Sequence, residues 1–203
     1  MKEIRDAGFG RLDGKRNVLY VHGFRSAGKS GTSQTIRRLM PEANVFSPDL
    51  PVDADEAVAL LRKIGEKEKI DVVVGTSMGG MLAQKLRGVP KILVNPSFHV
   101  SRTFRKNMGR VSYFKPREDG ATEFEITTET ADGYERLEKS QFDGLTPEER
   151  EITIGVFGTN DDTVDCRDEF MEHYDKMMYF DGGHRLDEKA IEEVIVPAIL
   201  TMA

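Results

Sequence analysis

Residues 72–80 read VVVGTSMGG, and this stretch decides the fold. It contains the pattern GxSxG, formed by Gly75, Ser77 and Gly79, with an apolar strand expected before it and a helix after it. A serine on so sharp a turn needs both glycines, because the neighbouring backbone comes too close for side chains. The turn also places the serine at a helix N-terminus, where the dipole favours a developing negative charge. The stretch predicts a nucleophilic Ser77 in an α/β fold.

Short apolar runs alternate with segments of helical spacing along the rest of the chain. This alternation is typical of a mostly parallel sheet flanked by helices. Strands are expected at residues 17–21, 71–74, 91–94, 152–157 and 177–180. Helices are expected at residues 53–67, with an Asp cap, 77–87, 168–174 and 187–200, the last kinked at Pro197. The length of 203 residues favours a single domain, residues 1–203.

Residues 97–150 interrupt this alternation after the third clear strand. They mix phenylalanines and tyrosines with glycine, proline and many charges. Such an insertion in a compact α/β domain is often a lid or a substrate-binding region. The alternative is a surface excursion with one small hairpin around residues 118–127. The basic stretch 102–110 within it is expected to be a solvated lid or helix face.

Composition excludes several classes of function. The formal net charge of -6 leaves no excess of cations for a phosphate backbone, so nucleic acid is not the expected partner. The single cysteine, Cys166, excludes an internal disulfide and fits a reducing, cytoplasmic compartment. The start, MKEIRDAGFGRLDG, carries charges where a signal peptide needs its apolar stretch, and no apolar run approaches the roughly 18 residues of a membrane span. No residue cluster calls for a metal or an organic cofactor, and nothing indicates the oligomeric state.

A serine nucleophile needs a base and an acid further along the chain, in the order Ser, Asp, His. His184 is the favoured base, because it follows the last expected strand in the glycine loop DGGHR. The acid is expected in the loop GTNDDTVD, which holds Asp161, Asp162 and Asp165. Asp161 is favoured because the residues DDTV, which begin with it, look like the DxxV pattern. This pattern is common at the corresponding loop of hydrolases that use a serine nucleophile. Asp162 is the second candidate for the acid.

The remaining histidines and the cysteine have simpler interpretations. His22, at a strand end, is expected to be structural, and His173 is expected on a helix surface. His99 opens the insertion and is a candidate for lining a pocket. Cys166 has no turn of the GxSxG kind around it, so it is expected to be a buried filler rather than a nucleophile.

The stretch HGFRSAGKS, residues 22–30, fits two incompatible patterns. From Gly23 it matches the phosphate-binding pattern GxxxxGK[ST]. A phosphate-binding loop also needs an acidic residue at the end of another strand to help hold Mg²⁺, and it should pass directly into a helix. The best apolar runs lack such an acid, and Gly31 follows where a helix should already be running. An accidental match is therefore the favoured interpretation, with nucleotide binding as the less favoured one.

The second pattern in the same stretch is a strand that runs into an HGF turn. In hydrolases, such a turn donates a backbone N–H to an oxyanion. The backbone N–H groups of Phe24 and Met78 are then the expected oxyanion donors. Ser26, Lys29 and Ser30 would shape the pocket rim or cap the next helix.

The runs LYVHGFRSAGKS, SPDLP, GTSMGG, LVNPSF, GTNDDTVD and DGGHR together resemble the YqiA-like family of small intracellular esterases in the α/β-hydrolase superfamily. The resemblance spans residues 19–185. It implies an α/β-hydrolase fold with Ser77 as nucleophile, Asp161 as acid and His184 as base.

The expected function is a serine-dependent hydrolase that cleaves carboxylic esters through an acyl-enzyme. Its partner would be a small-molecule ester or thioester. A thioesterase or an acyltransferase would use the same three residues. Two less favoured functions are nucleotide binding through residues 22–30 and binding without catalysis by a protein that keeps the hydrolase fold.

Overall fold

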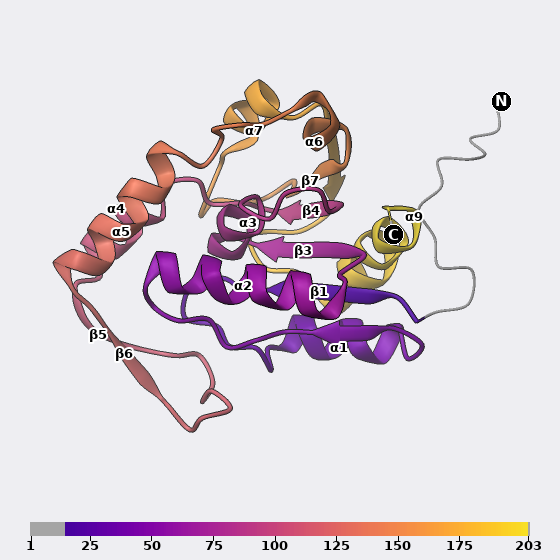
Figure 1. Cartoon of the computed structure of the whole chain (residues 1–203). Coiled ribbons are helices and arrows are strands. Elements are labelled where there is room, and N and C mark those ends of the chain that lie inside the picture. Colours follow the sequence, from indigo (N-terminus) through magenta and orange to yellow (C-terminus); the bar gives the residue numbers. More distant parts are fainter. Residues whose placement is uncertain (1–14, 203) are drawn as a thin grey trace, which may run out of the picture.

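The computed structural model describes residues 15–202, which form a central sheet of six parallel strands in the order β2-β1-β3-β4-β7-β8 (Figure 1). The strands are β1 Asn17–Val21, β2 Asn44–Phe46, β3 Val72–Thr76, β4 Lys91–Val94, β7 Thr153–Gly158 and β8 Lys176–Phe180. The five predicted strands are confirmed with ends shifted by one or two residues at most. The stretch MKEIRDAGFGRLDG, on which the absence of a signal peptide was predicted, lies outside the described residues.

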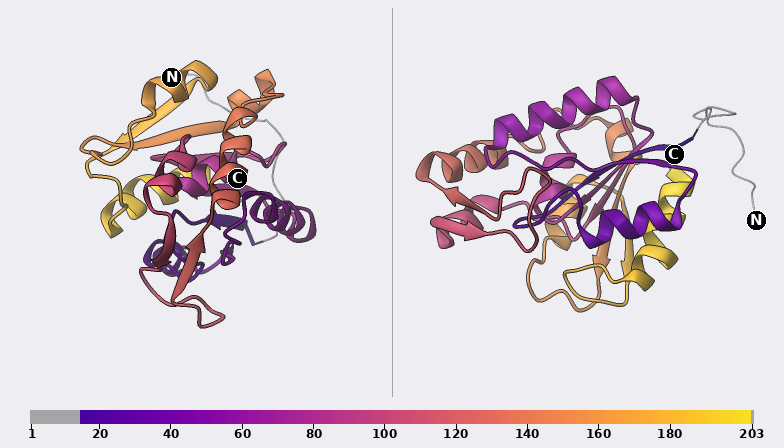
Figure 2. Two further views of the ribbon diagram at one scale, coloured as in Figure 1. Left: turned by 90° about the vertical axis from the view of Figure 1, so that its left-hand side faces the viewer. Right: turned by 90° about the horizontal axis from the view of Figure 1, so that it is seen from below.

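Helices cover both faces of the sheet. Their bounds are α1 Gly31–Leu39, α2 Ala54–Glu68, α3 Met78–Ala83, α4 Val100–Lys106, α5 Thr128–Lys139, α6 Pro147–Glu151, α7 Arg167–His173, α8 Glu188–Ala190 and α9 Val196–Met202. Helices α1 and α2 lie on opposite faces (Figure 2, right). One buried core contains Leu61 of α2 and Met81 of α3, and a second contains Ile36 of α1 and Ile199 of α9. The predicted parallel sheet with flanking helices is confirmed. None of the helices within residues 15–202 is long and apolar enough to cross a membrane.

The sequence analysis missed β2 and gave no bounds for α1. Strand β2 has only three residues, and none of them is fully buried, so it leaves almost no apolar run. Helix α1 buries only Ser33 and Ile36, which is too little for an apolar stripe at helical spacing. Its first turn is instead capped by Ser30, whose hydroxyl accepts from the Ser33 N–H.

Helix α3 ends at Ala83, four residues before the predicted end at residue 87. The next N–H groups bond three residues back, from Lys85 to Leu82 and from Leu86 to Ala83, so the chain leaves the α-helix in tight turns. Gln84, the residue after α3, is buried, and its side chain is bonded to a glutamine of the insertion and to the tyrosine that follows α7.

The C-terminal helix predicted at 187–200 is divided. A π-helical turn, Ile191–Ile195, connects α8 to α9, directly before Pro197. Proline has no N–H to donate and its ring crowds the preceding turn, so a regular ladder cannot run through this point. The disturbance predicted at Pro197 is present as this wider turn.

The insertion at residues 97–150 folds into α4, an antiparallel hairpin of β5 Gly109–Ser112 and β6 Glu123–Ile126, α5 and α6. It lies at the end of the sheet where the strands β3 and β4 terminate (Figure 1). Phe98, Phe104 and Tyr134 are fully buried in the core that also contains residues of α2 and α3. The interpretation as a mere surface excursion is therefore wrong. The small hairpin is present, but its first strand begins before the predicted 118–127.

Candidate active site

Ser77 stands on a strained turn between β3 and α3. Its backbone has φ 54° and ψ -121°, a region that residues with a side chain rarely adopt. A Cβ at Gly79 would overlap the carbonyl oxygens of Val21 and His22, and one at Gly75 would collide with Gly79. The GxSxG spacing is thus required by close backbone contacts, as the sequence pattern predicted.

The structure brings Ser77, His184 and Asp161 into one hydrogen-bonded chain. The His184 Nε2 lies 3.0 Å from the Ser77 Oγ, and the His184 Nδ1 lies 2.7 Å from the Asp161 Oδ2. The Asp161 side chain is only 6% exposed and that of His184 is 19% exposed, so the hydrogen bond between them is largely shielded from water. These distances are short enough for proton transfer between serine and imidazole.

Only one of the three candidate aspartates reaches the imidazole. The second oxygen of Asp161 accepts from the N–H groups of Thr163 and Val164, which fixes the carboxylate in place. Asp162 is exposed and, among the described residues, accepts only from the neighbouring Thr163 hydroxyl. Asp165 pairs with Arg167, which lowers the pKa of Asp165 to about 2.

Asn95, at the carboxyl end of β4, positions the histidine loop, and the sequence analysis gave it no role. Its amide nitrogen donates to the carbonyls of Gly183 and His184, and its oxygen accepts from the N–H of Gly158. The side chain is 1% exposed and the backbone has φ 40°. The asparagine in LVNPSF, directly after a buried strand, was the one available signal.

Phe24 and Met78, the expected oxyanion donors, lie beside the serine. Met78 is the first residue of α3, so its N–H has no partner inside the helix. Gly23 is packed so closely that a Cβ there would lie 3.2 Å from the Ser77 Cβ. Within residues 15–202, neither the Phe24 nor the Met78 N–H donates to a protein acceptor.

A cleft of about 640 Å³ opens over this group of residues. Ser77, His184, Phe24 and Met78 line it together with residues of α1, the insertion and the C-terminal helices. Its wall is mostly apolar, and it is large enough for a small organic molecule. The insertion contributes Val100, Thr103, Phe114 and Lys115 to the wall.

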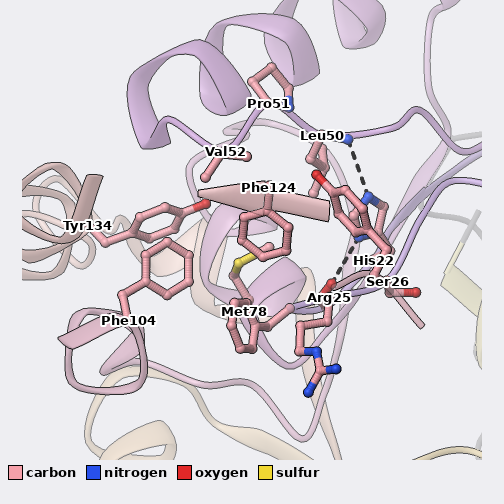
Figure 3. A pocket seen from close by; sticks show the side chains of 13 residues that line it. His22, Arg25, Ser26, Leu50, Pro51, Val52, Met78, Phe104, Phe124 and Tyr134 are labelled. Atoms are coloured by element: carbon pink, nitrogen blue, oxygen red, sulfur yellow. Dashed lines mark hydrogen bonds between the residues drawn. The ribbon is translucent and has the colours of Figure 1, made fainter. Parts of the chain in front are cut away.

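Phe24 and Met78 also line a second, small cavity of about 20 Å³ (Figure 3). Here the rings of Phe104, Phe124 and Tyr134 from the insertion turn toward the Met78 thioether. The Phe24 ring lies 5.2 Å from that of Phe104, centroid to centroid. The insertion thus packs against both proposed donor residues. The cavity has room for little more than one methyl group or one water molecule.

His22 joins the turn at the end of β1 to a neighbouring loop. Its Nδ1 donates to the Gly23 carbonyl, and its Nε2 accepts from the Leu50 N–H (Figure 3). One donating and one accepting ring nitrogen is the pattern of a neutral imidazole. Burial also favours the neutral form and lowers the pKa of His22 to about 4. This arrangement supports the structural interpretation of His22.

The low pKa of His22 predicts a loss of stability in mild acid. Unfolded chains take up a proton at His22 near pH 6.5, whereas the folded protein resists it until about pH 4. The contribution of the neutral His22 to the free energy of unfolding is therefore complete above about pH 6.5. It falls as the pH drops below that value, by about 2 kcal/mol between pH 7 and pH 5. Urea unfolding at both pH values measures it. His22→Gln should show a smaller difference between the two pH values than the wild type, and equal differences would contradict the prediction.

The loop of the phosphate-binding pattern is occupied by a carboxylate. The Gly28 N–H donates to Asp49 at 2.7 Å, and the loop passes into α1 at Gly31. The argument that Gly31 is incompatible with a helix is therefore wrong. The stronger objection is the Asp49 carboxylate, which holds the amide that a phosphate would need and would repel a phosphate there. Ser30 caps α1, as one interpretation of the stretch predicted.

The remaining histidines and the cysteine lie outside the hydrogen-bonded chain. His99 faces Glu169 at 2.8 Å, and the ring of His173 stacks on Phe142. Burial raises the pKa of the Cys166 thiol, so this residue stays protonated as a filler would. Across residues 15–202, no group of three or more His, Cys, Asp and Glu side chains could hold a metal ion.

Comparison with known proteins identifies the fold. A model of an uncharacterised protein family (UPF0227) matches residues 17–198. A comparison with curated proteins gives no match. Alpha/beta hydrolase domain-containing protein 10 from mouse is similar in structure, with 13% identity, a TM-score of 0.63 and coverage of 95% of this chain and 91% of its own.

Two bacterial or environmental proteins are also similar in structure. One structure is from the metagenome-derived lipolytic enzymes LipS and LipT, with 13% identity, a TM-score of 0.62 and 93% coverage of both chains. The second is the esterase RhEst1 from Rhodococcus sp. ECU1013, with 12% identity, a TM-score of 0.56 and coverage of 93% of this chain and 92% of its own. At such identities the likeness shows the α/β-hydrolase fold alone, which confirms the predicted fold class.

Proposed function

This chain belongs to the UPF0227 family, the YqiA-like family that its motifs resemble, and on that basis we propose that it is a serine-dependent hydrolase of carboxylic esters. The observation that carries the proposal is the pair of hydrogen bonds from Ser77 to His184 and from His184 to Asp161. That the similar structures include a lipolytic enzyme and an esterase gives further support.

The first half of the reaction forms an acyl-enzyme. The Ser77 Oγ attacks the ester carbonyl carbon while His184 Nε2 takes the hydroxyl proton. The negative carbonyl oxygen accepts hydrogen bonds from the N–H groups of Phe24 and Met78, and each such donor is worth about 3 kcal/mol in the transition state. The C–O bond to the alcohol then breaks, and the alcohol leaves with the proton from His184.

The second half releases the acid. A water molecule gives a proton to His184 Nε2 and attacks the acyl carbon, again with the oxygen held by the two N–H groups. The bond to Ser77 Oγ breaks, and the serine takes the proton back from His184. Asp161 keeps the imidazole in the tautomer with Nδ1–H and stabilises its positive charge in both halves.

The same groups would serve a thioester, or an acyl transfer in which another alcohol replaces the water. An assay with added alcohol acceptors separates acyl transfer from hydrolysis, and a comparison of esters with thioesters separates the two substrate classes. We also propose that the insertion acts as a wall of the substrate cleft, since its residues line it. A reducing, cytoplasmic location is proposed from the single cysteine.

The test of this proposal is labelling with a fluorophosphonate, a reagent that reacts with activated serines and needs no knowledge of the substrate. Peptide mass spectrometry should find a single adduct, on Ser77. A His184→Ala variant that melts like the wild type should give no adduct. Labelling of the folded wild type elsewhere, or not at all, would contradict the proposal.

A further inference from the structure

Two arginines contact one exposed aromatic ring at the mouth of the cleft. The guanidinium carbon of Arg25 lies 4.7 Å from the centroid of the Phe114 ring, and that of Arg185 lies 4.4 Å from it. Each arginine directly follows a residue of the proposed chemistry, Phe24 in one case and His184 in the other. The hairpin loop of the insertion therefore holds both cations against a ring that lines the cleft.

The arrangement around Phe114 is anchored by the backbone. The Phe114 N–H donates to the Arg25 carbonyl at 2.8 Å, and the Arg25 Nε donates to the Ser112 carbonyl at 2.8 Å. Arg25 itself adopts a left-handed conformation, with φ 61°. The aromatic face supports the guanidinium groups through cation–π attraction and leaves their edges able to donate hydrogen bonds.

Neither arginine forms an ion pair in the part of the chain that the structure describes. Within residues 15–202, no carboxylate lies within ion-pair distance of Arg25 or Arg185, although the chain carries a net charge of -6. Apart from His184, the charged residues that line the cleft are Lys115, Arg185 and Glu188. Glu188 is paired with Arg38 at 2.8 Å, so the mouth of the cleft is left with an excess of positive charge.

An anion that enters this mouth supplies the negative charge that the two arginines lack among the described residues. A carboxylate or phosphate oxygen accepts hydrogen bonds from guanidinium edges in favourable geometry, and such charge-assisted bonds are about twice as strong as neutral ones. A neutral oxygen there would accept only weaker hydrogen bonds, and a methyl group would accept none. Cations in a cleft with apolar walls also raise the local concentration of anionic substrates.

We propose that Arg25 and Arg185, supported by Phe114, form an anion-binding subsite, so that the preferred substrate is an ester with a carboxylate or phosphate group at its outer end. This inference rests on the proposed ester hydrolysis at Ser77. The subsite adds a substrate class to that activity and requires no further step in the reaction.

Two matched pairs of esters test the subsite. The first compares mono-p-nitrophenyl glutarate with p-nitrophenyl pentanoate, in which a methyl group replaces the carboxylate on the acyl side. The second compares 4-acetoxyphenyl phosphate with 4-methoxyphenyl acetate, in which the anion is on the leaving group. For each pair, the ratio of kcat/KM for the anionic to the neutral ester is measured in the wild type and in the double variant Arg25→Gln/Arg185→Gln.

At least one ratio should exceed one in the wild type and fall about tenfold or more in the double variant. The pair that responds shows on which side of the ester the anion lies. The ratio should largely persist in Arg25→Lys/Arg185→Lys, which keeps both charges, and be unchanged in Arg62→Gln, which removes a charge from an exposed position on α2. Ratios that are the same in wild type and double variant for both pairs would overturn the proposal.

A binding measurement separates this inference from the proposed function. If no ester of either pair is hydrolysed, the proposed hydrolase activity fails. Calorimetric titration with glutarate and with phenyl phosphate then tests the subsite directly. Binding of either probe by the wild type that is lost in the double glutamine variant supports the subsite, whereas no binding of either probe overturns it. Melting curves establish that the variants are folded.

Discussion

Ser77→Ala is expected to reduce kcat for ester hydrolysis by about 10⁵-fold or more, to the level left by binding and oxyanion stabilisation alone. The change removes only the Oγ, whose hydrogen bond in the structure is to His184 Nε2. The Ser77 side chain makes no capping bond to α3, so the helix and the turn are retained. Turnover of p-nitrophenyl butyrate by the purified variant, together with its melting temperature, measures both effects.

A second serine in the same cleft is the control for this experiment. Ser97 also lines the cleft, and its contact with residue 77 is a backbone bond from the Ser97 N–H to the Ser77 carbonyl. Ser97→Ala makes the same chemical change without touching the proposed nucleophile, so kcat should stay within a few-fold of the wild type. Wild-type turnover by a folded Ser77→Ala protein would exclude this serine as the nucleophile.

The central part of the fold and the candidate nucleophile could be predicted from short stretches, because their determinants are local. Five strands are apolar runs of residues adjacent in sequence, and the turn at Ser77 needs glycines only two positions away. Helix α1 could not be found in this way. Its cap at Ser30 is a local feature, but its apolar face is a single buried isoleucine, Ile36.

The parts of the site that the sequence left open depend on contacts between distant segments. Asn95 bonds to Gly158 and to the His184 loop, which lie 63 and 89 residues further along the chain. No local pattern distinguishes such an asparagine from one in a turn. The insertion was ambiguous for the same reason, because the burial of Phe104 and Tyr134 follows from packing against α2 and α3 rather than from their spacing.

The choice between Asp161 and Asp162 shows the limit most directly. The two residues are adjacent and chemically identical, and only the path of the loop decides which carboxylate faces the imidazole. In the structure, Asp161 is turned inward by two bonds from Thr163 and Val164 and meets His184, while Asp162 is exposed. A pair of substitutions can therefore separate the role of the position from the effect of removing a charge in this loop.

Asp161→Asn should lower kcat by about 10⁴-fold, whereas Asp162→Asn should leave it nearly unchanged. The asparagine has the size of aspartate and one oxygen for the Thr163 and Val164 N–H groups, so the loop keeps its path. What is lost is the charge that stabilises protonated His184, together with the preference for the Nδ1–H tautomer that leaves Nε2 free to take the serine proton.

Steady-state kinetics at a fixed pH near 7.5, with a melting curve for each variant, measure this difference. Both substitutions remove one negative charge from the same loop, so a general electrostatic effect on the cleft would lower kcat in both variants alike. A loss confined to Asp161→Asn requires the direct contact with His184 Nδ1 at 2.7 Å. An equal loss in the two variants would indicate the general electrostatic effect, and no loss in either would mean that the imidazole is oriented by the backbone ties of its own loop, such as those from Asn95, rather than by a carboxylate.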